Sequence, residues 1–233
     1  MAVSIDTVYQ RVLAILNKEQ RGYITPTEFN LLANQAQMSI FEQYFYDINQ
    51  FSRIPGNDTE YSDMLNTLNE KIEIFETSTN LSHANQVFTI PSSVYKLGSL
   101  YLLNSTTEIE RVTPKEYKRI ASSPLTKPSE SYPVAVVNGN SIKVHGKTFD
   151  AGVQIEANYI KKPATVKWGY TTVLGEALYN PAPAYSTDFE LHEMEESKLV
   201  IKILELAGLV IQDVGIYQVG DAEEKQKIQQ EKS

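Results

Sequence analysis

Histidines and clustered carboxylates are the residues of this chain that could support catalysis or metal binding, and their spacing leaves such a site incomplete. The three histidines, His83, His145 and His192, lie far apart in the sequence. His192 and Glu193 resemble the start of a zinc-protease helix, but no second histidine follows four residues after the first. Because zinc in such a helix needs that ligand, we expect no metal site here.

The neighbouring acids Glu193, Glu195 and Glu196 could in principle act as general acid and base. Acids at the start of a helix more often face solvent and interact favourably with the helix dipole, which is how we interpret them. The chain has no cysteine, and neither common glycine-rich phosphate-binding motif is present. The sequence therefore predicts no catalytic residue, no metal, no cofactor and a protein that is not an enzyme.

The only tryptophan, Trp168, follows three lysines, Lys161, Lys162 and Lys167. A basic cluster with an aromatic ring can contact a phosphate backbone or a sugar. Alternatively, the indole anchors the end of a strand in the core, where its large apolar surface is buried. We favour the second interpretation.

Composition indicates a globular protein. With 233 residues, of which 42% are hydrophobic and 21% charged, the chain can bury a substantial core. Its formal net charge of −8 argues against a general nucleic-acid-binding protein. The same charge would suit the wall of a channel through which DNA passes without being bound. No apolar run reaches membrane-spanning length, and residues 1–14 lack the layout of a signal peptide. We expect no membrane partner and assembly in a reducing cytoplasm.

A long helix from Thr25 to Phe51 is the central predicted element. Thr25 and Glu28 can form a capping box, and Pro26 suits the first helical position. Apolar residues recur at steps of three and four, which predicts a buried row. The members of that row are Phe29, Leu32, Ala36, Ile40, Tyr44, Ile48 and Phe51. A second row, formed by Leu31, Met38, Phe41 and Phe45, predicts that two faces of the helix are covered.

The remaining face of this helix carries amides where solvated helices usually carry Lys and Glu. Its members are Asn30, Asn34, Gln35, Gln37, Gln43, Asn49 and Gln50. Either this is a core helix with an unremarkable polar side, or the face belongs to a protein interface, since the centres of interfaces are depleted of charge and rich in aromatics. The candidate subunit-interface residues are Gln35, Phe41, Tyr44, Phe45, Tyr46, Asn49 and Phe51.

Two further helices complete a predicted helical unit of residues 1–82. Ser4 can cap a first helix that ends at Gly22 and packs antiparallel to the central helix. After a turn at 52–58, apolar residues from Tyr61 to Phe75 step by four and three, which predicts a third packed helix.

Residues 83–168 predict a small antiparallel β region with one short helix. Two short strands linked by a turn are expected at 87–90 and 95–103, another strand at 108–112, and a helix at 113–121 after a second capping signature. Asn138-Gly139 predicts a tight hairpin, which the strand 153–159 can join.

For the residues after 168, the sequence predicts a loop, then a helix and then a polar tail. Residues 169–187 show little regular pattern and are expected to be a loop. Ser186 or Thr187 can cap a closing helix that has Asp188 and Glu190 in its first turn and returns to the helical unit. The polar tail at 221–233 would order only against a partner. These elements (domains 1–82, 83–168, 169–187 and 188–233) predict an α+β fold.

The order of these elements resembles the head-to-tail adaptor proteins of short-tailed phages, the tail tubular protein A type. The resemblance is carried by the strand 87–91 that ends in proline, the Asn-Gly hairpin, the strand 153–159 before Lys-Lys-Pro, and 188–191 opening the last helix. The run from Val8 to Ile24, with Pro26, Phe29 and Asn30, is similar to the virion ring proteins of crAss-like phages of Bacteroidetes hosts.

The resemblance implies a structural virion protein that forms a ring of twelve copies at the head-tail interface. It also implies contacts with the portal protein and with further tail or ring proteins, and passage of DNA through the ring without specific binding. A scaffolding or other assembly protein is an alternative, as is a tail-associated glycan hydrolase. The hydrolase would require two carboxylates at a set separation, and the sequence offers no compelling pair.

Overall fold

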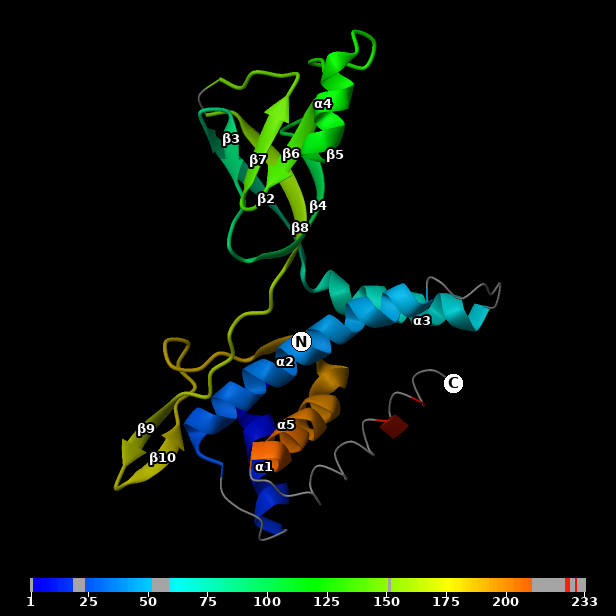
Figure 1. Cartoon of the computed structure of the whole chain (residues 1–233). Helices are drawn as coiled ribbons and strands as arrows, with labels where there is room; N and C mark the ends of the chain where they lie inside the picture. Colours follow the sequence, from blue (N-terminus) through cyan, green and yellow to red (C-terminus); the bar gives the residue numbers. More distant parts are fainter. Residues whose placement is uncertain are drawn as a thin grey trace. The chain divides into compact units, whose positions relative to one another are not determined.

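The computed structural model describes residues 2–18, 24–51, 59–150, 152–210, 225–226 and 229, and the chain divides into two compact units (Figure 1). Met1–Ile74 and Pro163–Ser233 form the helical unit, whereas Phe75–Lys162 form the β unit. The boundary therefore falls before the predicted one at residue 82. The reason is strand β2 (Glu76–Ala84), which pairs with a strand of the β unit along most of its length.

The helical unit contains α1 (Ile5–Lys18), α2 (Pro26–Phe51), α3 (Thr59–Glu73) and α5 (Glu196–Val210). The predicted capping box of α2 is present. The Thr25 amide donates to the Glu28 carboxylate at 2.9 Å, and the Glu28 amide donates to the Thr25 hydroxyl oxygen at 3.3 Å. As predicted, α5 is packed among other helices, against both α1 and α2. α1 packs mainly against α5, not against α2 as the sequence suggested, because α5 is apolar on most of its sides.

The start of the last helix differs from the prediction. Residues 189–192 form strand β11 (Phe189–His192), which pairs antiparallel with β1 (Ala2–Val3). A 3-10 turn, η1 (Glu193–Glu195), follows, and α5 begins only at Glu196. Phe189 and Leu191 are buried on one side of β11, which is strand periodicity. Asp188 caps another helix, because its carboxylate accepts a hydrogen bond from the Ile5 amide at 2.9 Å at the start of α1.

Residues 169–187, predicted to be a loop, contain a hairpin of β9 (Tyr170–Val173) and β10 (Glu176–Tyr179). Leu174 and Gly175 form its turn, with φ angles of +53° and +90°. Both turn residues of a tight type I′ hairpin need positive φ. Leucine at the first of these positions is uncommon, which is why the sequence did not indicate a turn.

The β unit is built on a seven-stranded sheet with the order β4-β8-β2-β3-β7-β6-β5. Besides β2, its strands are β3 (Val87–Thr89), β4 (Val94–Leu102), β5 (Glu110–Val112), β6 (Val134–Asn138), β7 (Ser141–His145) and β8 (Gln154–Lys161). The fold is mixed α and β as predicted, but this sheet is larger than the small β region expected. It is not wholly antiparallel either, since β5 and β6 run parallel.

The predicted hairpin is present with its loop displaced by one residue. Asn138 pairs with Ser141, so Gly139 and Asn140 form the turn, and Gly139 takes a positive φ of +57°. β8 does not join this hairpin directly but lies between β4 and β2. The core between the strands contains Phe88, Leu100, Ile142 and Ile155, among others.

Helix α4 (Pro114–Ser122) covers part of the sheet in the β unit and has the predicted capping box, with Thr113 as its N-cap. Tyr117 and Ile120 pack on Val112, Val134 and Val136 of the neighbouring strands. The opposite side of α4 is exposed. The predicted helix end at Gly22, the turn at 52–58 and the tail at 221–233, except residues 225, 226 and 229, lie outside the described residues.

Candidate functional site

The seven candidate interface residues of α2 occupy different environments. Phe41 and Tyr44 are buried in the core of the helical unit, so they do not belong to an exposed surface of the chain. Tyr44 belongs to the predicted buried row, and Phe41 belongs to the second predicted row. Phe45 is half-buried and makes an edge-to-face contact with Phe41, the ring centroids lying 5.0 Å apart. The side chain of Phe51 lies outside the described residues.

Gln35, Tyr46 and Asn49 are exposed and share one face of α2 with Leu31 and Glu42. These five residues, called the outer stripe here, follow steps of four, seven, four and three along the helix. Leu31 is 69% exposed and Tyr46 is 61% exposed. Glu42 is the only charged residue of the stripe. The structure thus leaves a charge-poor surface with two large apolar side chains on α2.

Three amides on another face of α2 bind the chain itself. Asn30 pairs with Trp168: the Trp168 amide donates to Oδ1 at 2.7 Å, and Nδ2 donates to the Trp168 carbonyl at 3.2 Å. Asn34 pairs in the same way with Val166, at 2.9 Å and 2.8 Å. Gln37 donates to the Ala164 carbonyl at 2.8 Å. We call this set of contacts the amide ladder.

The amide ladder follows from the repeat distances of the two backbones. Four helical residues rise roughly 6 Å and two extended residues about 6.6 Å, so Asn30 and Asn34 meet every second peptide of an extended segment. Gln37 follows three residues after Asn34 and reaches the next position, Ala164, with its longer side chain. Each asparagine satisfies one N–H and one C=O, as a neighbouring β-strand would. Part of the amide surface that suggested a subunit interface is therefore used inside the chain, and residues 164–168 were not predicted to take part.

Trp168 is 2% exposed, which confirms its predicted position in the core and leaves no ring face for an external base. Its indole N–H donates to the Asp6 carboxylate at 2.9 Å, and its ring packs on Tyr9 with centroids 4.4 Å apart. Tyr170 and Tyr179, from the two strands of the following hairpin, stack near the same indole. The tryptophan therefore anchors the base of the β9–β10 hairpin.

The β9–β10 hairpin extends from the helices of its unit as a two-stranded sheet of its own (Figure 1). Val173, Leu174 and Leu178 are all exposed. Glu176 is the only charged residue between 169 and 187. Two strands alone are marginally stable in water, and apolar side chains at an exposed turn gain free energy when they are covered.

Of the three acids that the sequence predicted to face solvent, Glu193 is exposed as predicted, whereas Glu195 and Glu196 have structural roles. Glu195 is buried and forms an ion pair with Lys71 of α3 at 2.7 Å, and the Lys71 ammonium also lies 5.8 Å from the centroid of the Tyr44 ring. Glu196 forms a more exposed pair with Arg11 at 2.9 Å. These contacts attach η1 and α5 to their neighbours. Within the described part of the chain, no three His, Cys, Asp or Glu residues gather as metal ligands would.

The three histidines serve separate local contacts. In the β unit, His83 lies 2.9 Å from the Asp150 carbonyl through Nε2, and His145 stacks on Tyr117. In the helical unit, His192 caps η1, its Nδ1 accepting from the Met194 amide at 3.3 Å. Burial lowers the pKa of His145, and the nearby Lys143 lowers it further.

Comparisons with known proteins do not place the chain in a family: no family model and no curated protein matches it. None of the described helices is both long and apolar enough to cross a membrane. Among the described residues of the helical unit, the outer stripe of α2 and the β9–β10 hairpin are exposed surfaces with large apolar side chains and little charge.

Proposed function

We propose that this chain is a non-enzymatic virion protein that forms a ring between the portal vertex and the tail of a phage and extends the channel for DNA. The observation that carries the proposal is the pair of exposed, charge-poor surfaces on one compact unit. Leu31 and Tyr46 lie on the outer stripe, and Val173, Leu174 and Leu178 lie on the hairpin. Among the described residues, both surfaces are exposed in the single chain.

Two different surfaces on one subunit are what a ring requires. A closed ring of identical copies uses a heterologous contact, in which one flank of each copy meets the other flank of the next. In this proposal the hairpin of one copy packs on the outer stripe of its neighbour. Burying a side chain such as Leu174 or Tyr46 would contribute about 1.5–3 kcal/mol of transfer free energy. Depletion of charge on both surfaces lowers the desolvation cost.

The length of α2 favours contact between copies over contact within one copy at the Tyr46 end of the outer stripe. Asn30, which holds Trp168 at the base of the hairpin, lies sixteen residues before Tyr46 on α2. That separation corresponds to roughly 24 Å along the helix. A four-residue strand is only about 13 Å long. The hairpin of one chain is therefore too short to cover Tyr46 of the same chain.

The similarity of Val8 to Ile24 to virion ring proteins supports the same role, with twelve copies in the ring. The helical unit carries 11 Lys and Arg against 22 Asp and Glu, a formal charge of −11. Such a unit suits a channel that DNA passes without specific binding. The partners in this proposal are further copies, the portal protein and other tail or ring proteins. Assembly takes place in the host cytoplasm, and the final location is the virion.

The test is the mass of the purified protein, measured by native mass spectrometry with and without isolated portal rings. The expected result is a twelve-copy ring on the portal, even if the protein alone is monomeric. Failure to bind portal rings at any concentration would contradict the proposal. Detection of the chain in purified, DNA-filled virions is the second requirement, because a scaffolding protein would leave the mature particle.

A further inference from the structure

The charge of this acidic protein is divided unevenly between its two units. The β unit contains ten Lys and Arg against seven Asp and Glu, a formal charge of +3, although the whole chain carries −8. A surface of opposite sign to the rest of the chain is therefore available on the β unit. The argument from net charge against nucleic-acid contact applies to the chain as a whole and not to this unit.

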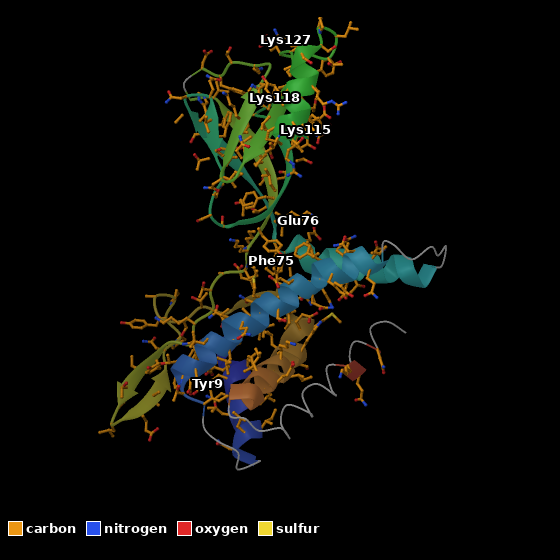
Figure 2. All side chains as sticks on the ribbon, in the orientation of Figure 1. Tyr9, Phe75, Glu76, Lys115, Lys118 and Lys127 are labelled. Carbon is orange, nitrogen blue, oxygen red and sulfur yellow. The ribbon has the colours of Figure 1, made fainter. Side chains whose placement is uncertain are left out.

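The cations of the β unit gather around α4. Lys115, Lys118 and Arg119 are exposed on the side of α4 that faces away from the sheet, and Lys127 follows in the next turn. Figure 2 shows Lys115, Lys118 and Lys127 spread along the helix and the segment after it. No ion pair involves these four cations within the described residues. Their charge is therefore not neutralised by close acidic partners.

The strand beside α4 extends this surface. Tyr117, on the inner side of α4, stacks on His145 of β7 with centroids 3.9 Å apart and an interplanar angle of 20°. Lys143, two residues earlier, lies on the same side of β7 as His145 and is exposed. We call Lys115, Lys118, Arg119, Lys127, Lys143 and Lys147 the basic face.

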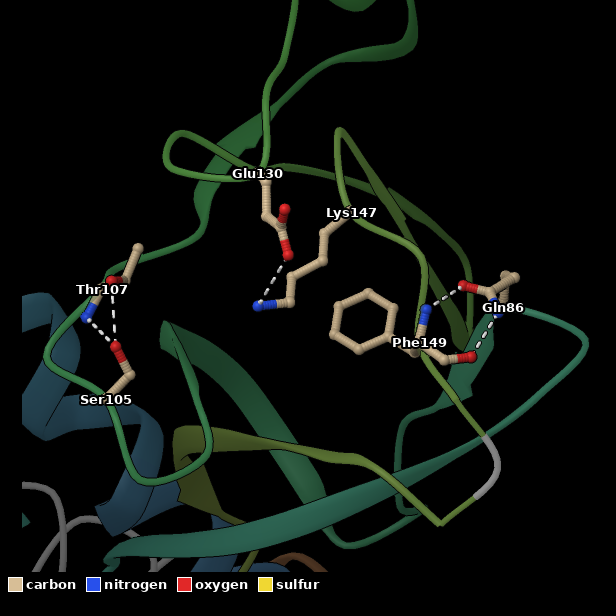
Figure 3. Close-up of polar contacts among 6 residues, drawn as sticks. All are labelled: Gln86, Ser105, Thr107, Glu130, Lys147 and Phe149. Atoms are coloured by element: carbon tan, nitrogen blue, oxygen red, sulfur yellow. Dashed lines mark hydrogen bonds and ion pairs between the residues drawn. The ribbon is translucent and has the colours of Figure 1, made fainter.

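A shallow pocket continues the basic face beyond β7. Its volume is about 360 Å³, and its lining includes Gln86, Glu130, Lys143, His145, Lys147 and Thr148. Figure 3 shows how Gln86, one of its lining residues, is held: the Gln86 side-chain amide donates to the Phe149 carbonyl at 2.7 Å and accepts from the Phe149 backbone amide at 2.9 Å. Glu130 lies 3.8 Å from Lys147 and is 80% exposed, so it neutralises that ammonium only weakly.

We infer that the β unit binds the phosphate backbone of nucleic acid across the basic face, without reading base sequence. Five of its six cations are lysines. Lysine is depleted in protein–protein interfaces, whereas lysine and arginine both neutralise phosphates and release counterions. The chemistry of this face therefore favours a phosphate polymer over an acidic protein. Glu116, the acid within α4, is used in the capping box with Thr113.

The inference goes beyond the proposed ring and does not depend on it. Contacts to phosphates position a nucleic acid and carry no sequence information. The pocket beside Lys143 and Lys147 has room for a phosphate group and offers the Thr148 hydroxyl as a donor. The face would hold DNA loosely, with an affinity that depends strongly on salt.

The experiment is fluorescence anisotropy of a labelled 20-base-pair DNA duplex with the full chain, over a series of NaCl concentrations. Lys118→Gln combined with Lys143→Gln tests the face. Lys96→Gln combined with Lys162→Gln is the matched control, because it makes the same charge change in the same unit at two lysines that are not part of the basic face. All four lysines are exposed, and unchanged circular dichroism would verify that the variants fold.

The expected result is binding at low salt that is the same for duplexes of unrelated sequence. The test variant should reduce the slope of log Kobs against log salt by about two, and the control should leave it within error. Equal effects of both variants, or no binding at low salt, would overturn the inference. Displacement of the duplex by polyglutamate as readily as by polyphosphate of equal charge would also overturn it, since the face would then recognise an acidic protein.

Discussion

Asn34 on α2 and Val166 on the extended segment pair through both ends of the side-chain amide, with hydrogen bonds of 2.8 Å and 2.9 Å. The two residues are 132 positions apart in the sequence. Together with the Asn30 contacts, this pairing fixes the segment that leads to Trp168 and to the base of the hairpin. The exposed surface on the hairpin therefore depends on amides in the middle of α2.

We expect Asn34→Ala to destabilise the helical unit by about 1–3 kcal/mol, because the backbone groups of Val166 lose their partners in a partly buried position. Urea unfolding followed by circular dichroism measures this change. Gln35→Ala is the control, since Gln35 is the next residue and is exposed, and it should change stability by no more than about 0.5 kcal/mol. Equal effects of the two substitutions would show that the pairing contributes little.

The ion pair between Lys71 and Glu195 gives a second prediction. The side chain of Glu195 is 2% exposed and that of Lys71 is 12% exposed. Removing one member leaves a buried charge, so Lys71→Met should cost about 3–5 kcal/mol. Adding Glu195→Leu to Lys71→Met should recover much of that loss, because an apolar pair replaces the ions.

The neighbouring pair of Arg11 and Glu196 is the control for this prediction. Its side chains are 54% and 29% exposed, so Arg11→Met should cost roughly 0–1 kcal/mol. Thermal unfolding of the wild type and the three variants gives the comparison. A loss at Arg11 as large as that at Lys71 would mean that burial does not distinguish the two pairs.

Elements defined by near neighbours could be predicted from the sequence. The capping boxes of α2 and α4 each involve residues three apart, and the β6–β7 hairpin is specified by its own turn. β2 was missed because Leu81 is its only fully buried residue and its partner β8 lies some 75 residues later. β11 was read as a helix start because its partner β1 is at the other end of the chain.

The candidate site, too, could be predicted where it depends on neighbouring residues of one helix and could not be predicted where it depends on distant ones. The charge-poor character of α2 was visible in the sequence, and Gln35, Tyr46 and Asn49 are exposed on it. The sequence could not tell amides that face outward from amides that bind residues 164–168, because both kinds follow helical spacing. The hairpin was missed as well: residues 169–187 were predicted to be a loop, because Leu174 at a position of positive φ does not indicate a turn.

The environment of His145 predicts a dependence of stability on pH. Burial, and secondarily Lys143, lowers the pKa of His145 below its ordinary value of 6.5. The unfolded chain therefore binds a proton more readily than the folded chain. The contribution of His145 to stability is complete above about pH 6.5 and decreases as the pH falls toward its lower folded pKa.

His145→Phe should remove this component while keeping an aromatic ring on Tyr117. The measurement is the difference in free energy of unfolding between wild type and variant, from pH 8 to pH 5. We expect the wild type to lose stability relative to the variant as the pH falls below about 6.5. A difference that stays constant over this range would contradict the assigned direction of the pKa shift.

The proposed contact between copies is tested by pairing Tyr46→Cys with Leu174→Cys in one chain. The natural chain has no cysteine, so any cross-link joins the introduced thiols. Because the hairpin base lies about 24 Å from Tyr46 along α2, the bond should join different copies. Oxidation of portal-bound protein should give a ladder of covalent oligomers in denaturing electrophoresis, ending in a closed ring.

Tyr46→Cys with Leu125→Cys is the control, because Leu125 is also highly exposed but lies in the β unit. Its oxidation should give no ladder under the same conditions. Rings that form without the Tyr46–Leu174 ladder would refute the contact while leaving the ring intact. Absence of rings on the portal would refute the proposed function itself, so the two failures can be told apart. A ladder from both cysteine pairs would mean that the cross-links form by random collision. The hairpin would then have no specific binding site on the outer stripe.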